Sequence, residues 1–201
     1  MRTFVFTSLL LFLAFEGLSQ TSYGVRMGIV SSRLTFNEVF GTRQLDGVLG
    51  YQVGVFAEKP IKDSKLFLQP EVLYTRAEGH MLFGPNQLEF VFRRLNVPVN
   101  VGYKKGEFRF TAGPSFHFLF DGSWESDLVP PLVNIEYNGF VYGYQLGFGL
   151  HKADWVFDIR YEGSFNRSAK VAINSPPEFD LRLTQWNIGV TVDLMRHRWS
   201  Q

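Results

Sequence analysis

The chain has 201 residues, a length that suits one domain built as a single core or a single closed barrel. The formal net charge of +1 gives no electrostatic footprint for nucleic acid, so no nucleic-acid partner is expected. The absence of cysteine excludes disulfides, thiolate metal sites and cysteine nucleophiles, while 21 Phe, 8 Tyr and 19 Gly favour β-structure with tight turns.

The N-terminus has the pattern of a secretory signal peptide. Arg2 precedes an apolar run from Phe4 to Phe15, and Gly17 and Ser19 then occupy the small-residue positions before the cleavage site. This run holds 12 residues, whereas a helix that spans a bilayer needs about 20. We therefore predict a cleaved signal peptide at residues 1–19 and a mature domain at residues 20–201.

Eight later segments alternate apolar and polar residues with the period of two that a β-strand requires. They cover residues 23–29, 49–57, 66–75, 91–103, 108–120, 140–150, 155–162 and 185–194. Single-chain bacterial barrels have an even number of strands, each with one face toward lipid and one toward the interior. The sequence thus predicts an all-β fold, an eight-stranded antiparallel up-and-down transmembrane β-barrel.

Most charged residues of these segments share a face with glycines, with Arg93 as an outward exception. Eight strands leave a lumen just wide enough for packed side chains, where glycine fits well, whereas a soluble barrel would turn its charges to water. We therefore expect the charges inside and the apolar face in contact with outer-membrane lipid. The expected interior charge network comprises Arg26, Glu71, Arg94, Arg109, Asp158, Arg160 and Glu162. Because an unpaired charge is costly there, we expect ion pairs, with a small aqueous pore or a ligand-binding lumen as the alternative.

The connections between the segments alternate between long and short. Those at residues 58–65, 104–107 and 151–154 have the lengths of turns, and those around residues 31–48, 76–89, 121–138 and 164–183 are long. Outer-membrane barrels have short periplasmic turns and long external loops. This order predicts that both ends of the mature chain lie in the periplasm.

The histidines do not suggest a metal site. His80, His117, His151 and His197 are expected in a loop, a strand, a turn and the tail, and we expect no cofactor. Ser115 and His117 lie two residues apart on one strand face, as a catalytic pair could, but no nucleophile-elbow motif surrounds them. We predict no catalytic residue.

Three prolines fall within predicted strands, at Pro70, Pro98 and Pro114. Proline lacks the amide hydrogen that a strand interior needs, so we expect β-bulges at these positions.

The runs LFLQPEVLYTRAEG, FRRLNVPVNVGY, FRFTAGPSFHFLF, GFVYGYQLGFGL and FDIRYEGSFN, in this order, resemble the PorT-type outer-membrane β-barrel family common in Bacteroidetes. The resemblance covers the mature chain, and it implies a fold and a location more than an activity. Barrels of this kind often finish on an aromatic residue, whereas this chain continues past Leu194. Trp199 is then a candidate for the C-terminal assembly signal.

We expect a non-enzymatic outer-membrane barrel, structural or accessory to envelope or secretion function. Envelope or secretion-complex proteins would bind its long external loops or its periplasmic turns. Two alternatives remain open at this point: a soluble exported barrel that carries a small apolar ligand, and an outer-membrane enzyme that modifies lipid.

Overall fold

The computed structural model describes residues 21–38, 41–61, 64–83, 86–126, 133–166, 169–173 and 179–195. The predicted signal peptide and Trp199 lie outside these ranges. Within them, no helix is long and apolar enough to cross a membrane.

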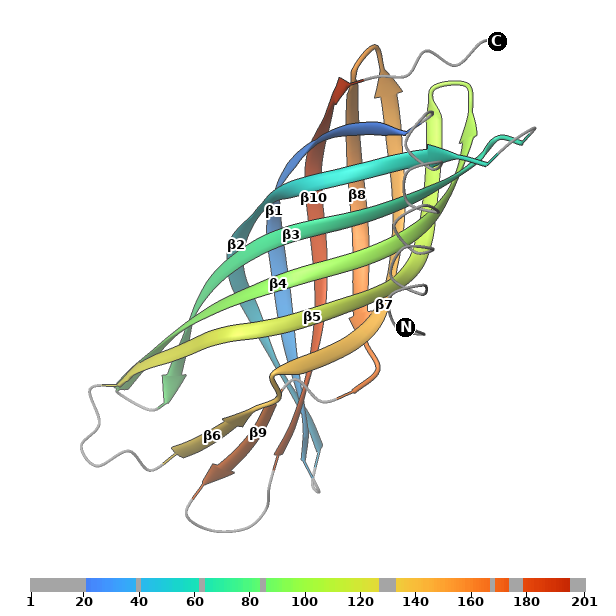
Figure 1. Cartoon of the computed structure of the whole chain (residues 1–201). Coiled ribbons are helices and arrows are strands. Elements are labelled where there is room, and N and C mark those ends of the chain that lie inside the picture. The colour runs from blue at the N-terminus through green and yellow to red at the C-terminus, as the bar shows by residue number, and fades with distance from the viewer. Residues whose placement is uncertain are drawn as a thin grey trace, which may run out of the picture.

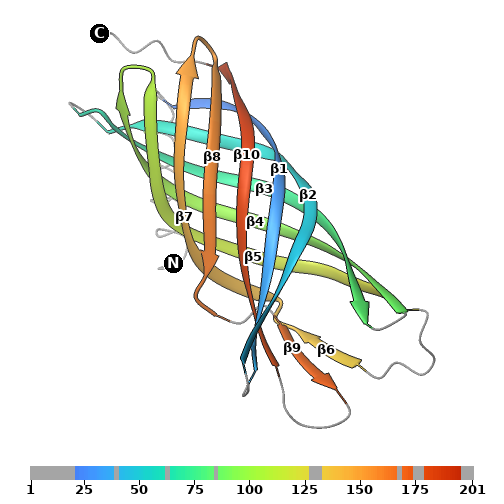
Figure 2. The same ribbon diagram turned by 180° about the vertical axis from the view of Figure 1, so that it is seen from behind.

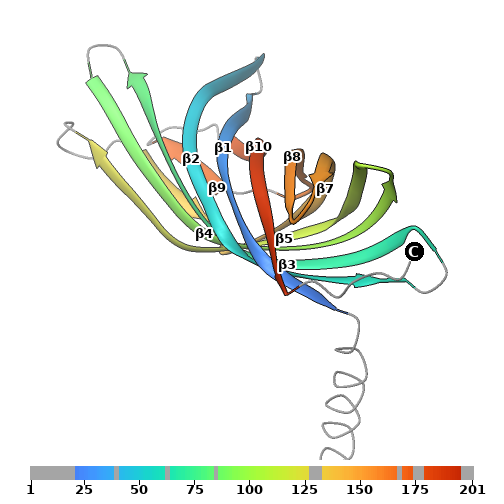
Figure 3. The same cartoon turned by 90° about the horizontal axis from the view of Figure 1, so that it is seen from above.

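Eight strands close into an antiparallel barrel, which confirms the predicted fold (Figures 1 and 2). They are β1 (Ser22–Glu38), β2 (Gly41–Pro60), β3 (Leu66–Phe83), β4 (Asn86–Lys105), β5 (Phe108–Ser126), β7 (Phe140–Lys152), β8 (Trp155–Ser164) and β10 (Phe179–Met195). Each strand pairs with the next in this order, and β10 closes the ring by pairing with β1 from Tyr23 to Asn37. The strands are strongly tilted, so their ends fan outward when the molecule is seen from above (Figure 3).

Two short strands that the alternation did not predict lie beyond one end of the barrel. Strand β6 (Val133–Tyr137) pairs with β9 (Ala169–Ile173), and β9 pairs with the start of β10. Both belong to segments expected to be long connections, and they extend the wall past the barrel (Figure 1).

Two of the predicted long connections are wrong. Strands β1 and β2 pair as far as Glu38 and Gly41, and β3 and β4 pair as far as Phe83 and Asn86. Backbone pairing does not require alternating side chains, so the strands continue where the apolar alternation stops. The alternation marks only the part of each strand that has one apolar face.

The turns between β4 and β5 and between β7 and β8 lie at the end where the described chain begins and where β10 finishes. The turn between β4 and β5 uses Gly106 at φ 63°, and the turn between β7 and β8 uses Ala153 at φ 57°. Ser22 pairs with Glu58 near the turn between β2 and β3, and Tyr23 pairs with Met195. We call this the turn end of the barrel and the opposite end, with β6 and β9, the loop end.

The prolines interrupt the ladders without shifting them, so the predicted bulges are wrong. Between β3 and β4 the pairing passes from Pro70–Val99 to Leu73–Asn96 in unchanged register. The pairing between β4 and β5 likewise keeps its register on passing Pro98. A missing amide hydrogen removes one hydrogen bond, which the long ladders on either side tolerate. A register shift between β4 and β5 occurs instead at Arg93 and Arg94.

Burial is reversed relative to a soluble barrel. On the outer face Ile29 and Ile188 are each 67% exposed, whereas the inward Arg26 is fully buried and Glu71 is 1% exposed. Apolar side chains therefore cover the outside and polar side chains fill the inside, the distribution that a lipid environment favours.

Candidate functional site

All seven residues of the expected charge network lie inward and are buried. The least buried of them, Asp158, is 9% exposed. They come from strands β1, β3, β4, β5 and β8, so the closure of the barrel brings together residues that are far apart in sequence. Six of them form three clusters along the lumen, and Arg94 donates to Gln185 of the third cluster.

The central cluster is a neutral group of two arginines and two carboxylates. Arg26 Nη2 donates to Asp158 Oδ1 at 2.7 Å, and Arg160 Nε donates to the same oxygen at 3.1 Å. Arg160 Nη1 donates to Glu71 Oε1 at 2.6 Å, and Arg26 Nε lies 3.9 Å from Glu71 Oε2. Glu71 on β3 and Arg160 on β8 are four strands apart in a ring of eight. Their ion pair therefore spans the lumen.

The turn-end cluster centres on Glu58, which the sequence patterns did not select. Its carboxylate accepts hydrogen bonds from Lys104 and, at 3.0 Å, from Arg109 Nη2. Arg109 also donates to Gln69, and its guanidinium lies 4.6 Å from the centroid of the buried Phe67 ring. A paired charge and a cation–π contact thus fill this end of the lumen.

Glu58 and Lys104 were missed because they were assigned to short connections. The signal was present: the inward face of β2 continues every second residue from Gln52 through Phe56 to Glu58. The predicted strand ended at residue 57, because the polar residues that follow it were assigned to a turn.

The loop-end cluster is built around Glu162. Ser115 Oγ donates to Glu162 Oε1 at 2.7 Å, and His117 Nε2 lies 2.5 Å from the same oxygen. Gln145 and Gln185 donate to Glu162 Oε2 at 3.3 Å and 2.6 Å. All five side chains are buried.

Ser115 and His117 are close together, but they lack the geometry of a catalytic relay. In such a relay one imidazole nitrogen faces the nucleophile and the other faces a carboxylate. Here His117 Nε2 faces both Ser115, at 3.3 Å, and Glu162, while Nδ1 has no hydrogen-bond partner among the described residues. The serine hydroxyl is fully buried and bonded to the carboxylate. The arrangement suits a structural hydrogen-bond cluster.

Hydrogen bonds join the three clusters into one network. Gln69 Nε2 donates to Glu71 at 3.0 Å, which connects the turn end to the centre. Gln145 accepts from Arg160 at 3.1 Å and donates to Glu162, which connects the centre to the loop end. The network therefore runs along the lumen from Glu58 to Glu162.

Inward glycines make room for this network. A Cβ at Gly189 would lie 2.6 Å from Arg26 Nη2 and 2.9 Å from its Cζ. Arg26 cannot swing away easily, because Asp158 and Asn187 both accept hydrogen bonds from its guanidinium.

We expect Gly189→Ala to lower the free energy of unfolding by about 1–3 kcal/mol, the usual effect of overpacking. Urea titration of the folded barrel in detergent measures it. Gly139→Ala is the matched control, because nothing lies within 4 Å of a Cβ there, and it should change stability by less than about 0.5 kcal/mol. Equal effects at the two sites would contradict this reading of the lumen.

The histidines give no metal site within the described part of the chain, where no group of three or more potential ligands occurs. His117 belongs to the loop-end cluster and His151 is half-buried near the end of β7. The His80 side chain and His197 lie outside the residues whose side chains are described.

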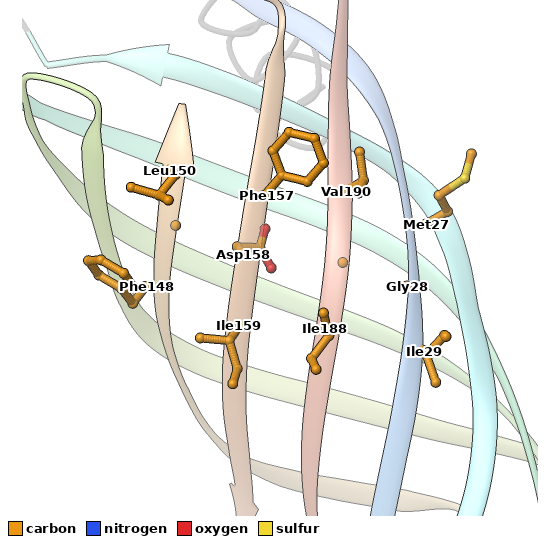
Figure 4. A pocket seen from close by; sticks show the side chains of 12 residues that line it. Met27, Gly28, Ile29, Phe148, Leu150, Phe157, Asp158, Ile159, Ile188 and Val190 are labelled. Atoms are coloured by element: carbon orange, nitrogen blue, oxygen red, sulfur yellow. The ribbon is translucent and has the colours of Figure 1, made fainter. Parts of the chain in front are cut away.

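A shallow apolar groove runs over the outer face of β7, β8, β10 and β1 (Figure 4). The residues that line it include Phe148, Phe157, Ile159 and Ile188, which project outward. It belongs to the apolar outer surface and not to the lumen.

Sequence comparison matches residues 18–170 to the model of the family described as outer membrane protein beta-barrel domain. A search of curated proteins finds no match.

Solved structures of outer-membrane barrels are similar in fold. OprG from Pseudomonas aeruginosa is 13% identical, with a TM-score of 0.53, over 90% of this chain and 99% of its own. Neisserial surface protein A (NspA) is 12% identical, with a TM-score of 0.49 over 88% and 100% of the two chains. Ail, the attachment invasion locus protein of Yersinia pestis, is 12% identical, with a TM-score of 0.48 over 86% and 98%. The likeness to OprG shows the fold alone. Because the family match covers more than half of the chain, this protein belongs to the outer membrane protein β-barrel domain family and is a barrel of the outer membrane.

Proposed function

We propose that this protein is a non-enzymatic structural barrel with a closed lumen, of the PorT type, whose interior charges rigidify its wall. The observation that carries the proposal is the set of side-chain contacts that cross the lumen. Arg160 reaches Glu71 at 2.6 Å, and Arg94 reaches Gln185, in each case between strands on opposite sides of the ring. A solute would have to break these contacts to pass.

An open pore is disfavoured by the size of the barrel as well as by the contacts. Eight strands enclose a space that side chains fill, whereas water-filled channels need about 16 strands. The side chains buried inside the barrel include large ones such as Arg26, Phe67 and Gln69, each 0% exposed. Breaking one ion pair would leave a charge uncompensated, so thermal opening should be rare.

Planar-bilayer conductance tests the closed lumen. The purified protein, first shown to be folded by its heat-modifiable migration, should give no conductance steps in 1 M KCl. The variant Glu71→Ala/Arg160→Ala removes one cross-lumen contact without changing net charge and is expected to give brief, small openings. A steady ohmic channel from the unmodified protein would contradict the proposal.

Orientation is a further part of the proposal: both ends of the mature chain face the periplasm, after removal of residues 1–19. The tight turns at Gly106 and Ala153 share the turn end with the start of β1, and short turns are periplasmic in bacterial barrels. The chain has no cysteine, so single cysteines can report sidedness. In intact cells a membrane-impermeant maleimide should label Gly139→Cys at the loop end and not Glu107→Cys at the turn end. The reverse labelling would invert the assignment.

The proposed binding surface for protein partners is formed by the connections at the loop end, which extend the wall through β6 and β9. We propose that they contact proteins of the envelope or of a secretion complex, while lipid surrounds the barrel. The polar lumen disfavours carriage of an apolar ligand, since such a ligand needs an apolar cavity. The engaged Ser115–Glu162 hydrogen bond disfavours lipid hydrolysis through Ser115.

A further inference from the structure

Strand β6 forms a free edge of the wall at the loop end, where it lies beside β9 (Figures 1 and 2). In the order of the sheet it comes last, after β10 and β9, and among the described residues it pairs only with β9. This pairing runs without a register shift from Val133 to Tyr137. In an antiparallel pair every second residue directs its backbone N–H and C=O away from the neighbouring strand. The outer edge of β6 therefore presents backbone hydrogen-bonding groups that no described strand uses.

This edge lacks the features that ordinarily prevent a further strand from pairing. Proteins protect exposed edges with proline, lysine, bulges or charges. The β6 sequence VNIEY contains no proline or lysine, and its one charged residue is Glu136. The projecting part of β2 differs: it carries Arg43 and Asp46, and its pairing with β1 shifts register before Leu34. The edge of β6 is therefore suited to accept another strand.

The register across β10, β9 and β6 defines which residue types a further strand would meet. One cross-strand row is apolar and consists of Phe179, Val171 and Ile135. The next row belongs to the opposite face of the sheet, alternates in charge and consists of Asp180, Lys170 and Glu136. Cross-strand pairs of opposite charge and pairs of β-branched or aromatic residues stabilise a sheet. A strand that continues both rows has a basic residue opposite Glu136 and apolar residues on either side of it.

A second copy of this chain does not suit the edge. Antiparallel strands of two identical copies are related by a two-fold axis perpendicular to their sheet, whereas two copies in one membrane are related by an axis along the membrane normal. Strands β6 and β9 continue the barrel wall, which runs along that normal (Figure 1). The two axes are therefore incompatible. In addition, β6 contains no basic residue that could lie opposite Glu136 of another copy.

We propose that the free edge of β6 binds an extended segment of a partner protein by strand addition, and that this segment alternates apolar residues with a basic residue opposite Glu136. The inference rests on the proposed contact between the loop end and envelope or secretion proteins, and it specifies how that contact is made. Backbone hydrogen bonds provide the affinity, and the two rows provide the register and the selectivity. A short segment suffices, since β6 has 5 residues.

A synthetic peptide tests the edge in the folded, full-length mature protein in detergent. The probe is a short fluorescent peptide that alternates lysine and valine, and fluorescence anisotropy measures its binding. The peptide should bind and should slow amide hydrogen exchange at residues 133–137. The same peptide N-methylated throughout should not bind, because it keeps the side chains but has no backbone donors. Equal binding of the two peptides, or binding without protection of β6, would overturn strand addition.

Charge variants test the predicted register. A peptide that alternates glutamate and valine should bind the unmodified protein about 3- to 10-fold more weakly than the lysine peptide. Glu136→Lys should reverse this preference, while Glu107→Lys, the same charge change at an exposed position of the turn end, should retain it. Should Glu136→Lys disturb β6 itself, Glu136→Gln should bind the two peptides equally. An undiminished preference for lysine in either Glu136 variant would refute the assigned register.

A separate experiment reports on the proposed function. A photo-cross-linking residue in place of Gly139 in intact cells captures proteins at the loop end whatever their mode of binding. Cross-linking to an envelope protein without binding of the lysine peptide would refute strand addition and leave the proposed contact standing. Peptide binding without any such cross-link would refute the proposed contact and leave the assignment of the β6 edge standing.

Discussion

Replacing Glu71 by glutamine is expected to lower the free energy of unfolding by about 3–5 kcal/mol, as removal of one partner from a buried ion pair does. Glutamine keeps an oxygen that can accept from Arg160 and Gln69, so the hydrogen bonds at 2.6 Å and 3.0 Å have a substitute. What disappears is the negative charge. Arg26 and Arg160 would then share the single carboxylate of Asp158.

The double variant Glu71→Gln/Arg160→Gln separates this charge effect from a general loss of packing. It leaves Arg26 and Asp158 as a neutral pair, so it should be destabilised by less than the sum of the two single variants. Urea-induced unfolding in lipid vesicles, followed by tryptophan fluorescence, provides the four free energies of the cycle. Additive losses would mean that the central cluster is not coupled by charge.

The second large effect is expected on the outer face, where Ile188→Arg should cost about 2–4 kcal/mol. Ile188 is 67% exposed and lies near the middle of the barrel part of β10, so the arginine would face the hydrocarbon of the bilayer. Leu194→Arg is the matched control. Leu194 is 65% exposed on the same face of the same strand, but it lies one residue from the turn-end terminus of β10.

Depth in the membrane is the main difference between these two positions. Near the interface the same substitution should cost only about 0–1 kcal/mol, because the guanidinium reaches water and headgroups. Both variants are measured as reversible unfolding from vesicles. Similar small losses at both positions would indicate that the apolar outer face is not in contact with lipid.

The fold was predictable because strand side chains alternate and because the inward set mixes glycine with charge. Arg26 and Glu71 were assigned inward from that pattern, and both are buried. The pattern failed where strands pair through their backbones but their side chains do not alternate between apolar and polar. Strands β1 and β2 pair past Leu34 and Leu45, where the predicted connection lies. Backbone hydrogen bonds do not depend on the type of side chain, so the sequence pattern does not reveal the pairing there.

The partners within the lumen could not be predicted. Whether Arg160 meets Glu71, Asp158 or both depends on which strands face each other and at what height, and this follows from strand tilt and register. Glu58 was assigned to a turn and was missed for that reason. At Pro70 the sequence predicted a bulge that is not present, because the ladders on either side hold the register.

In the proposed barrel the two faces of the wall have opposite environments, lipid outside and a closed polar network inside. Spin labels at single cysteines along β8, from Val156 to Tyr161, test it directly in lipid vesicles, because the chain has no cysteine of its own. Collision with oxygen, which dissolves in lipid, should be high at 157, 159 and 161 and low at 156, 158 and 160, while a water-soluble nickel complex should reach neither set. High nickel collision at the outward positions, or oxygen collision in the opposite phase, would contradict the claim.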